Sequence, residues 1–187
     1  MCYSFRKMIS TLKNMENLTV YASPCGNLLI GEVDGAVCLC DWINAGRSEA
    51  TLQRIQRRLG KSHISCQHGV KSPLLERTVS ELEEYFAGKR NSFDIVLKPV
   101  GTEFQAMVWQ SLLTVPYGHT ATYMSIAEAI GRPLSVRAVA NAIGANPLSI
   151  LIPCHRIIGA DGTLTGYAGG LEAKRYLLEL ENKYGSR

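Results

Sequence analysis

The stretch Ile150-Leu-Ile-Pro-Cys-His-Arg156 joins a run of apolar residues directly to a thiol, an imidazole and a guanidinium. A thiol that follows a buried strand or extended segment is expected at the floor of a site, away from the solvated surface. The histidine can exchange protons near neutral pH. The arginine is a permanent cation, which can favour a thiolate or hold the local backbone. The sequence therefore predicts that Cys154 is a nucleophile at the end of a buried segment.

The residues around this stretch predict a mostly helical, winged-helix-like domain over residues 99–187. Two short helices on either side of a Gly-Arg-Pro turn have the proportions of a helix-turn-helix. The second is rich in small residues and could approach another backbone closely. The glycine-rich loop 159–170 is expected to be a β-type loop placed like a wing. The expected helices are 104–113, with a capping pair at Thr102 and Gln105, then 123–130, 135–143, capped by Ser135, and 171–181.

Residues 15–98 predict a small antiparallel sheet with helices. Three β-like runs, 18–22, 27–33 and 36–42, are separated by residues typical of turns. Helices are expected at 48–59 and 74–86, and a short strand at 93–97. Together with the helical second half, this predicts an α/β chain of the α+β type with two domains. Residues 1–14 are expected to be disordered or dispensable.

Length and composition limit the class of protein. The 187 residues suffice for one large domain or two small ones, each with its own core. No apolar stretch approaches the ~20 residues of a membrane span, and the first residues lack the apolar core of a secretion signal. A cytoplasmic chain that does not bind membranes is therefore expected. The net charge of +4 permits nucleic-acid binding without requiring it, and it predicts a modest salt dependence.

Five of the six cysteines fall in the first 66 residues, and Cys154 is the sixth. A zinc site formed by Cys38 and Cys40 with His63 and His68 is conceivable, but the spacing is irregular for zinc ligands. We expect Cys38 and Cys40 to be free thiols on the same face of a strand, and no metal to be bound. A single cysteine in the second half suits a nucleophile.

Three stretches together resemble the O6-alkylguanine-DNA alkyltransferases. They are residues 150–159 around Pro-Cys-His-Arg, residues 166–171 with the sequence Gly-Tyr-Ala-Gly-Gly-Leu, and residues 141–147, which end in Asn-Pro. The resemblance covers about 101–181, and residues 1–100 match only loosely. It implies a ribonuclease-H-like first domain and direct, irreversible, stoichiometric transfer of an alkyl group from O6-alkylguanine to Cys154. It also implies a monomer that flips the base out of double-stranded DNA through the minor groove and needs no cofactor; transfer from O4-alkylthymine stays open.

The resemblance assigns roles in the reaction to five residues. Cys154 accepts the alkyl group, and His155 acts on it through a water while Glu181 orients the imidazole. This is the logic of a nucleophile, a base and an orienting group. Tyr123 supplies the proton to the departing base, and Asn146 hinges the recognition helix onto the cysteine segment.

The resemblance also assigns residues that bind the substrate. Tyr123 contacts the target phosphate, and Arg137 enters the base stack where the flipped base has left. The pocket edge comes from the backbone around Cys154 and Ile157 and from the loop of Tyr167. At Ala168 some members have serine, so a backbone contact is retained there and a hydroxyl contact is lost. For Arg156 the sequence leaves two roles open, electrostatic help and a structural ion pair.

Two other classes of function remain open from the sequence. A cysteine hydrolase with a Cys-His-Glu set would need an oxyanion hole and would turn over. A non-catalytic DNA-lesion binder or regulator could use the same helix-turn-helix. A persistent alkyl adduct on Cys154 would distinguish an alkyltransferase from both.

Overall fold

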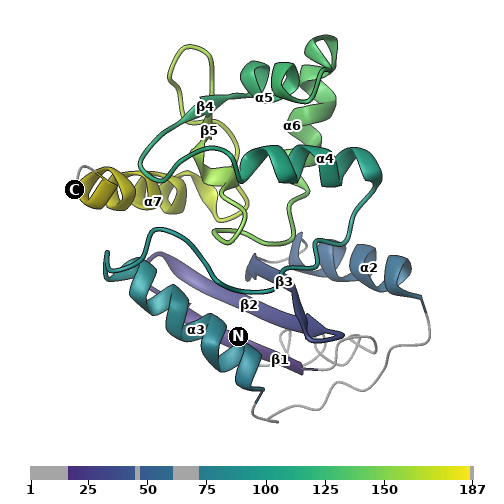
Figure 1. The fold of residues 1–187 in the computed structure, drawn as a ribbon, viewed down its shortest axis with the longest axis vertical. Coiled ribbons are helices and arrows are strands. Elements are labelled where there is room, and N and C mark those ends of the chain that lie inside the picture. The colour runs from purple at the N-terminus through teal and green to yellow at the C-terminus, as the bar shows by residue number, and fades with distance from the viewer. Residues whose placement is uncertain (1–16, 45–46, 61–71, 186–187) are drawn as a thin grey trace.

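The computed structural model describes residues 17–44, 47–60 and 72–185. The expectation for residues 1–14, and the proposal that His63 and His68 bind zinc, therefore lie outside the described residues. Figure 1 shows a sheet flanked by two helices in the first half of the chain, with the mostly helical second half stacked on it. The predicted α/β fold class is confirmed. In the described part of the chain, no helix has the length and apolar character needed to cross a membrane.

The first half forms the predicted antiparallel sheet. Its strands are β1 (Asn17–Ser23), β2 (Gly26–Val33) and β3 (Ala36–Trp42), hydrogen-bonded in the order β1-β2-β3. The β2–β3 turn has positive φ at both Asp34 and Gly35, 50° and 69°. Such a turn matches the twist of the strands that it joins.

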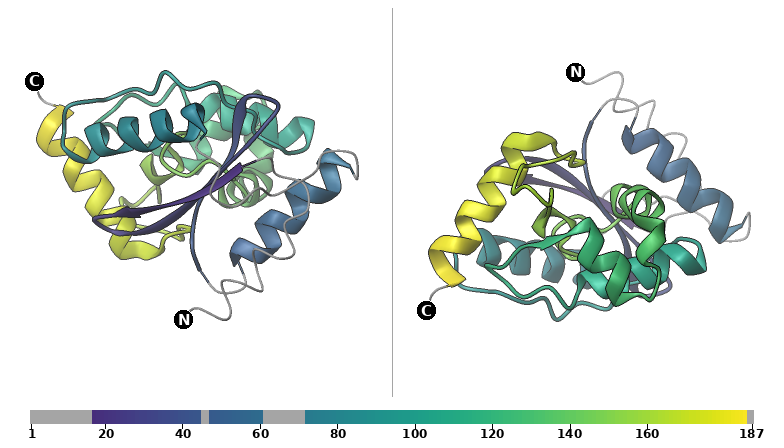
Figure 2. Two further views of the ribbon diagram at one scale, coloured as in Figure 1. Left: turned by 90° about the horizontal axis from the view of Figure 1, so that it is seen from below. Right: turned by 90° about the horizontal axis from the view of Figure 1, so that it is seen from above.

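The two faces of this sheet pack against different partners. Helix α2 (Arg47–Leu59) covers one face and packs on Leu29 and Leu39. Helix α3 (Pro73–Phe86) and the second half of the chain cover the other, which includes Leu28 and Ile30. Figure 2 shows α2 and α3 on opposite sides of the strands.

The expectation that Cys38 and Cys40 share one face of a strand is wrong. Opposite Cys38 the pairing of β3 with β2 is irregular, because Val37 pairs with Glu32 while Leu39 pairs with Gly31. The extra residue is a β-bulge, which reverses the alternation of side chains. Cys38 therefore packs on the side of α2, and Cys40 packs on the opposite side.

The second half contains the predicted helices with short connecting elements. Thr102 and Gln105 form the expected capping box, and Thr122 and Ser125 form a second one that the sequence analysis did not anticipate. Ser135 precedes its helix but makes no capping hydrogen bond through its side chain. The elements are α4 (Glu103–Leu112), β4 (Ala121–Thr122), α5 (Tyr123–Ala129), η1 (Pro133–Ser135), α6 (Val136–Gly144), η2 (Cys154–Arg156), β5 (Ile157–Ile158) and α7 (Gly170–Gly185).

Two segments meet the outer edge of the sheet at one bridge each. The predicted strand 93–97 reduces to one bridge, between Leu97 and Val37 on the outer edge of β3. Leu148, just before the cysteine segment, bridges Cys40 further along the same edge. The two segments thus share the outer edge of β3, each through a single bridge. The second bridge also joins the cysteine segment to the sheet of the first half.

The segment before Cys154 is a buried turn, not a strand. Ile150 has φ of 71°, a left-handed conformation that is rare and costly for a β-branched residue. Its side chain is buried, and the backbone closes a turn in which Ile152 N–H donates to the Leu148 carbonyl. The predicted wing is also not β structure. Residues 159–169 form an irregular loop that begins with a turn between Gly159 and Thr163.

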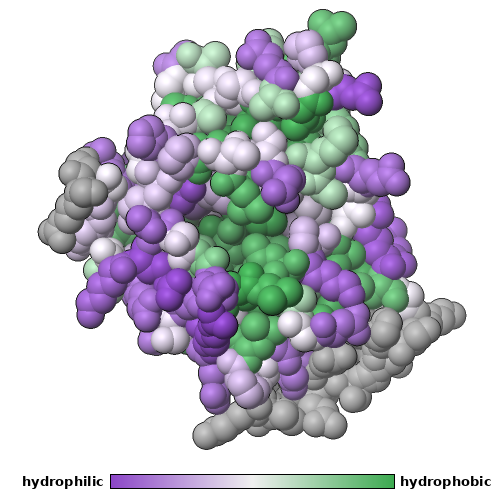
Figure 3. All heavy atoms as spheres, in the orientation of Figure 1, coloured by the Kyte–Doolittle hydropathy of each residue, from purple (hydrophilic) through white to green (hydrophobic). Residues whose placement is uncertain are grey.

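One apolar cluster extends through both halves of the molecule. It joins Leu28 and Trp42 of the sheet, Tyr85 of α3, Trp109 of α4 and Leu177 of α7. On the face shown in Figure 3, apolar atoms reach the surface in the middle of the molecule, between the two halves. The cysteine segment therefore lies in a core to which both halves contribute.

Candidate active site

Cys154 opens the short helix η2 and is almost completely enclosed, with 6% of its surface exposed. Asn146, which follows α6, holds the thiol from the adjacent segment. Its side-chain amide donates to Cys154 Sγ (3.1 Å) and to the Ile152 carbonyl (2.9 Å). Its Oδ1 accepts the backbone N–H of Leu148 at 3.0 Å. One asparagine thus fixes both the sulfur and the turn that leads to it.

His155, the next residue in η2, contacts the carboxylate of Glu181 on α7. Its Nε2 lies 2.8 Å from Glu181 Oε1, and both residues are fully buried. Burial lowers the pKa of His155, although the hydrogen bond to Glu181 opposes this effect. An ionised carboxylate only accepts hydrogen bonds, so Nε2 carries the proton of the neutral ring. Nδ1 is then the basic nitrogen, and it has no protein partner in the described ranges.

Arg156 forms an ion pair with Glu181, which decides between the two roles left open by the sequence. Its Nε donates to Oε2 (2.8 Å) and its Nη2 to Oε1 (3.0 Å), while Nη1 donates to the Val115 carbonyl. Burial alone would raise the pKa of Glu181. Hydrogen bonds from His155 and Arg156 outweigh burial and lower this pKa to about 2. Glu181 is therefore an anion whose charge is compensated by Arg156.

Two further donors to Glu181 were not predicted from the sequence. The hydroxyl of Tyr85, on α3, donates to Oε1 at 2.8 Å, and the Gly118 N–H donates to Oε2 at 3.1 Å. Gly118 has φ of 75°, and a Cβ there would lie 3.2 Å from the Glu181 carbonyl oxygen. Gly118 lies between α4 and β4, and no sequence pattern indicated which acceptor its N–H would meet. No sequence pattern links Tyr85 to Glu181, which lies 96 positions later in the chain.

Lys174 is a buried cation that was also not predicted from the sequence. Its ammonium group donates to the carbonyls of Ile157 and Thr165, and so ties the loop after η2 to α7. Burial lowers the pKa of Lys174, and the nearby Cys154 opposes that shift. The available signal was spacing, because Lys174 lies seven residues before Glu181 and therefore on the same side of α7.

The predicted pocket loop is held by the first half of the chain. Trp42, at the end of β3, donates from Nε1 to the Tyr167 hydroxyl at 3.1 Å, and the two rings meet edge to face. Asn44 donates to the Ala168 carbonyl. The ring of Tyr167 also lies edge-on to His155, at 6.3 Å between centroids. Tyr167 thus connects the sheet of the first half to the histidine.

Tyr123 and Arg137 lie outside the network around Glu181. Tyr123 is the first residue of α5. Its hydroxyl lies 2.8 Å from Oγ1 of Thr165, which belongs to the loop 159–169. Arg137 is exposed in the first turn of α6. Ile157 is buried in β5, which pairs in parallel with β4. The structure thus brings together Cys154, Asn146, His155, Glu181 and Tyr167, and it leaves Arg137 at the surface.

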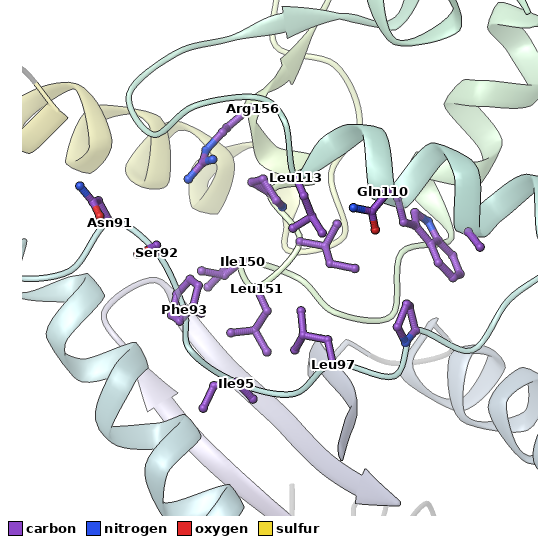
Figure 4. Close-up of a pocket in the computed structure, with 15 residues that line it drawn as sticks. Asn91, Ser92, Phe93, Ile95, Leu97, Gln110, Leu113, Ile150, Leu151 and Arg156 are labelled. Carbon is purple, nitrogen blue, oxygen red and sulfur yellow. The ribbon is translucent and has the colours of Figure 1, made fainter. Parts of the chain in front are cut away.

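A cavity of about 540 Å³ lies between the two halves of the chain, and residues 150–153 of the cysteine segment line one side of it. Figure 4 shows Ile150 and Leu151 facing Phe93, Ile95 and Leu97 across it, with Arg156 at one end. Cys154 does not line this cavity. No group of three or more potential metal ligands occurs among the residues that the structure describes.

Comparison with known proteins gives matches to both halves of the chain. A family model for the DNA-binding domain of 6-O-methylguanine DNA methyltransferase matches residues 103–183, and one for its ribonuclease-like domain matches residues 18–99. The crystal structure of Mycobacterium tuberculosis O6-methylguanine methyltransferase superposes with a TM-score of 0.74 at 38% identity, over 90% of this chain and 93% of that one. The chain belongs to the 6-O-methylguanine DNA methyltransferase family.

Two further matches are a second structure of the M. tuberculosis protein and a curated relative. A structure of the M. tuberculosis protein in complex with DNA also gives a TM-score of 0.74, at 38% identity over 90% of this chain and 94% of that one. A methylated-DNA--protein-cysteine methyltransferase of Methanosarcina barkeri is 56% identical over 101 residues, which is 54% of this chain. The match spans 64% of that relative, so less than two thirds of its length.

Proposed function

We propose that this protein repairs DNA by moving the alkyl group of O6-alkylguanine irreversibly onto Sγ of Cys154. The observation that carries the proposal is the buried thiol held by Asn146 beside a neutral His155, whose partner Glu181 is ionised. The family of the chain, and a relative that was crystallised with DNA, support the same reaction.

The reaction consumes one thiol and forms one thioether. The Cys154 proton passes through a water to Nδ1 of His155, and the thiolate attacks the alkyl carbon. The bond from that carbon to O6 breaks, and the departing guanine takes a proton from the Tyr123 hydroxyl. A proton returned from the site through solvent restores Tyr123. Nothing in this sequence of steps breaks the thioether, so each molecule reacts once.

The base must leave the DNA helix to reach a thiol that is buried this deeply. Flipping a nucleotide costs a few kcal/mol, and a planar cation that fills the gap in the stack offsets part of this cost. The exposure of Arg137 on α6 supports that role. The flipped base would then contact the backbone around Ile157 and the loop of Tyr167 and Ala168. We propose that a monomer binds the minor groove in this way, in the cytoplasm.

A mass measurement tests the proposal. The protein is incubated with a duplex that contains one O6-methylguanine, and the intact chain and its peptides are weighed. We expect one methyl group per chain, on Cys154, and no further change with time. Cys154→Ala should bind the duplex and gain nothing. Arg137→Ala should lose more rate on the duplex than on the free base.

The matched control is Cys25→Ala, which should still gain one methyl group. Cys25 is half-buried and its pKa is raised by burial, and burial raises the pKa of Cys38 to about 12. These thiols are therefore poor nucleophiles at neutral pH. Absence of an adduct with continued product release would indicate a hydrolase. Binding without either would indicate a lesion-binding protein.

A further inference from the structure

We propose that Tyr85, on helix α3 of the first half, is a positioning residue for the alkyl transfer. It holds the Glu181 carboxylate and lowers the proton affinity of His155 through it. The inference rests on the proposed function and adds a residue from the other half of the chain to the same site.

The hydroxyl of Tyr85 and the imidazole of His155 bind the same carboxylate oxygen. Each lies 2.8 Å from Glu181 Oε1. Tyr85 is 1% exposed, and its ring is fixed by Phe86, Phe93 and Tyr117 at centroid distances of 5.4 to 6.0 Å. The hydroxyl is therefore held at Oε1 by packing as well as by its hydrogen bond.

Tyr85 can only donate to Glu181. Burial raises the pKa of Tyr85 well above its usual value, and the charge of Glu181 raises it further, so the hydroxyl keeps its proton. A donor at Oε1 stabilises the negative charge that faces His155. Without this donor, the same carboxylate would attract the His155 proton more strongly, and protonated His155 would persist to a higher pH.

The other charged and titratable groups around this pair come from several elements. The permanent cation Arg156 forms its own ion pair with Glu181, so a change at Tyr85 removes one donor and leaves this ion pair in place. The groups that face the pair are Arg156 and Cys154 from η2, Lys174 from α7, Tyr117 from the segment between α4 and β4, and Tyr167 from the pocket loop.

The test is the pH dependence of single-turnover methyl transfer by Tyr85→Phe, measured at saturating duplex. Protonated His155 cannot accept the thiol proton, so the rate decreases when the pH is lowered past the value at which the site takes up a proton. This decrease is the acid limb of the pH–rate profile. Loss of one hydrogen bond to a charged group should move this acid limb to higher pH by roughly half a unit to one unit. A change in packing alone would lower the rate without moving the limb.

Two matched changes separate charge from packing. Tyr21→Phe removes one hydroxyl from a ring that packs on Phe86, next to Tyr85, and should leave the pH profile unchanged. Replacement of Tyr85 by 3-fluorotyrosine keeps the shape and makes the hydroxyl a stronger donor. It should move the limb to lower pH, and it tests the inference even where Tyr85→Phe does not fold.

The result that overturns the inference is an acid limb at the wild-type pH in every folded Tyr85 variant. A shift of the same size in Tyr21→Phe would also overturn it, because the effect would then not be specific to Glu181. Failure of the proposed function looks different. In that case the wild-type protein itself would gain no methyl group from the duplex.

Discussion

At the scale of single residues, one carboxylate is the hydrogen-bond acceptor that four groups of the site share. Glu181 accepts hydrogen bonds from a neutral imidazole, a guanidinium, a phenol and a backbone N–H. Because Arg156 already balances its charge, the carboxylate does not force a proton onto His155. A histidine that remains neutral at physiological pH can accept the thiol proton. In the proposed reaction, Arg156 would therefore act through its ion pair with Glu181.

The depressed pKa of Glu181 predicts a specific loss of stability in acid. The pKa falls from 4.5 to about 2 on folding, so the stabilisation is complete above pH 4.5 and is lost as the pH falls toward 2. The size of this contribution is about 3 kcal/mol. Glu181→Gln should remove this part of the pH dependence and leave Arg156 buried without its partner. At pH 7 we expect a destabilisation of about 3 to 5 kcal/mol by urea unfolding.

The control for this experiment is Glu179→Gln, two residues earlier on the exposed side of α7. Its free energy of unfolding should stay within about 0.5 kcal/mol of the wild-type value at each pH. An unchanged acid slope in Glu181→Gln would show that another carboxyl group is responsible for it.

At the scale of elements, the end of β3 supports the loop expected to receive the base. Trp42 donates to Tyr167, and its ring packs against the backbone of Gly169. A Cβ at Gly169 would lie 2.7 Å from that ring. The spacing between strand and loop is therefore set by the absence of a side chain at this position.

We predict that Gly169→Ala destabilises the protein by about 1 to 3 kcal/mol, because the added methyl group collides with a buried indole. The measurement is urea unfolding followed by the fluorescence of the two tryptophans. Gly166→Ala is the matched control in the same loop, since a Cβ there meets no atom within 4 Å. Equal effects of the two substitutions would mean that the loop is not held by contact with Trp42.

Local sequence signals predicted most elements, and long-range contacts explain the failures. Thr102 and Gln105 mark a helix start by their own hydrogen bonds, so the sequence suffices there. The bulge at Cys38 depends on pairing with β2, and the turn at Ile150 depends on an enclosure built by both halves. An apolar run such as 150–152 cannot indicate by itself whether it is a strand or a buried turn.

The candidate site was predictable where its residues are adjacent or belong to a recognisable pattern. Cys154 and His155 adjoin in the chain, and the structure places Glu181 and Asn146 against them as expected. Tyr85 and Lys174 were missed because each functions through a contact that only the fold creates. A buried tyrosine and a helical lysine have many structural roles, so residue type alone does not select them.

At the scale of the molecule, the two halves share one continuous apolar core, which Trp42 and Tyr85 enter from one half and Trp109 and Leu177 from the other. Separate domains with separate cores can unfold independently, whereas a shared core couples them.

We therefore predict a single unfolding transition in scanning calorimetry, with equal calorimetric and van't Hoff enthalpies of roughly 100 to 130 kcal/mol near 60 °C. Trp42→Ala should lower the midpoint of the whole transition without dividing it. Two resolved transitions, with the variant affecting only the earlier one, would contradict the coupling of the halves.

The position of Glu181 near the end of α7 has a consequence for the order in which the protein matures. Synthesis runs from the N-terminus, so the ribosome releases Tyr85 first, the cysteine segment later and the carboxylate later still. Until α7 has docked, His155 and Arg156 lack the group that orients them. We therefore expect the proposed transfer to Cys154 to begin only after α7 has packed against both halves of the chain, even though the thiol is synthesised earlier.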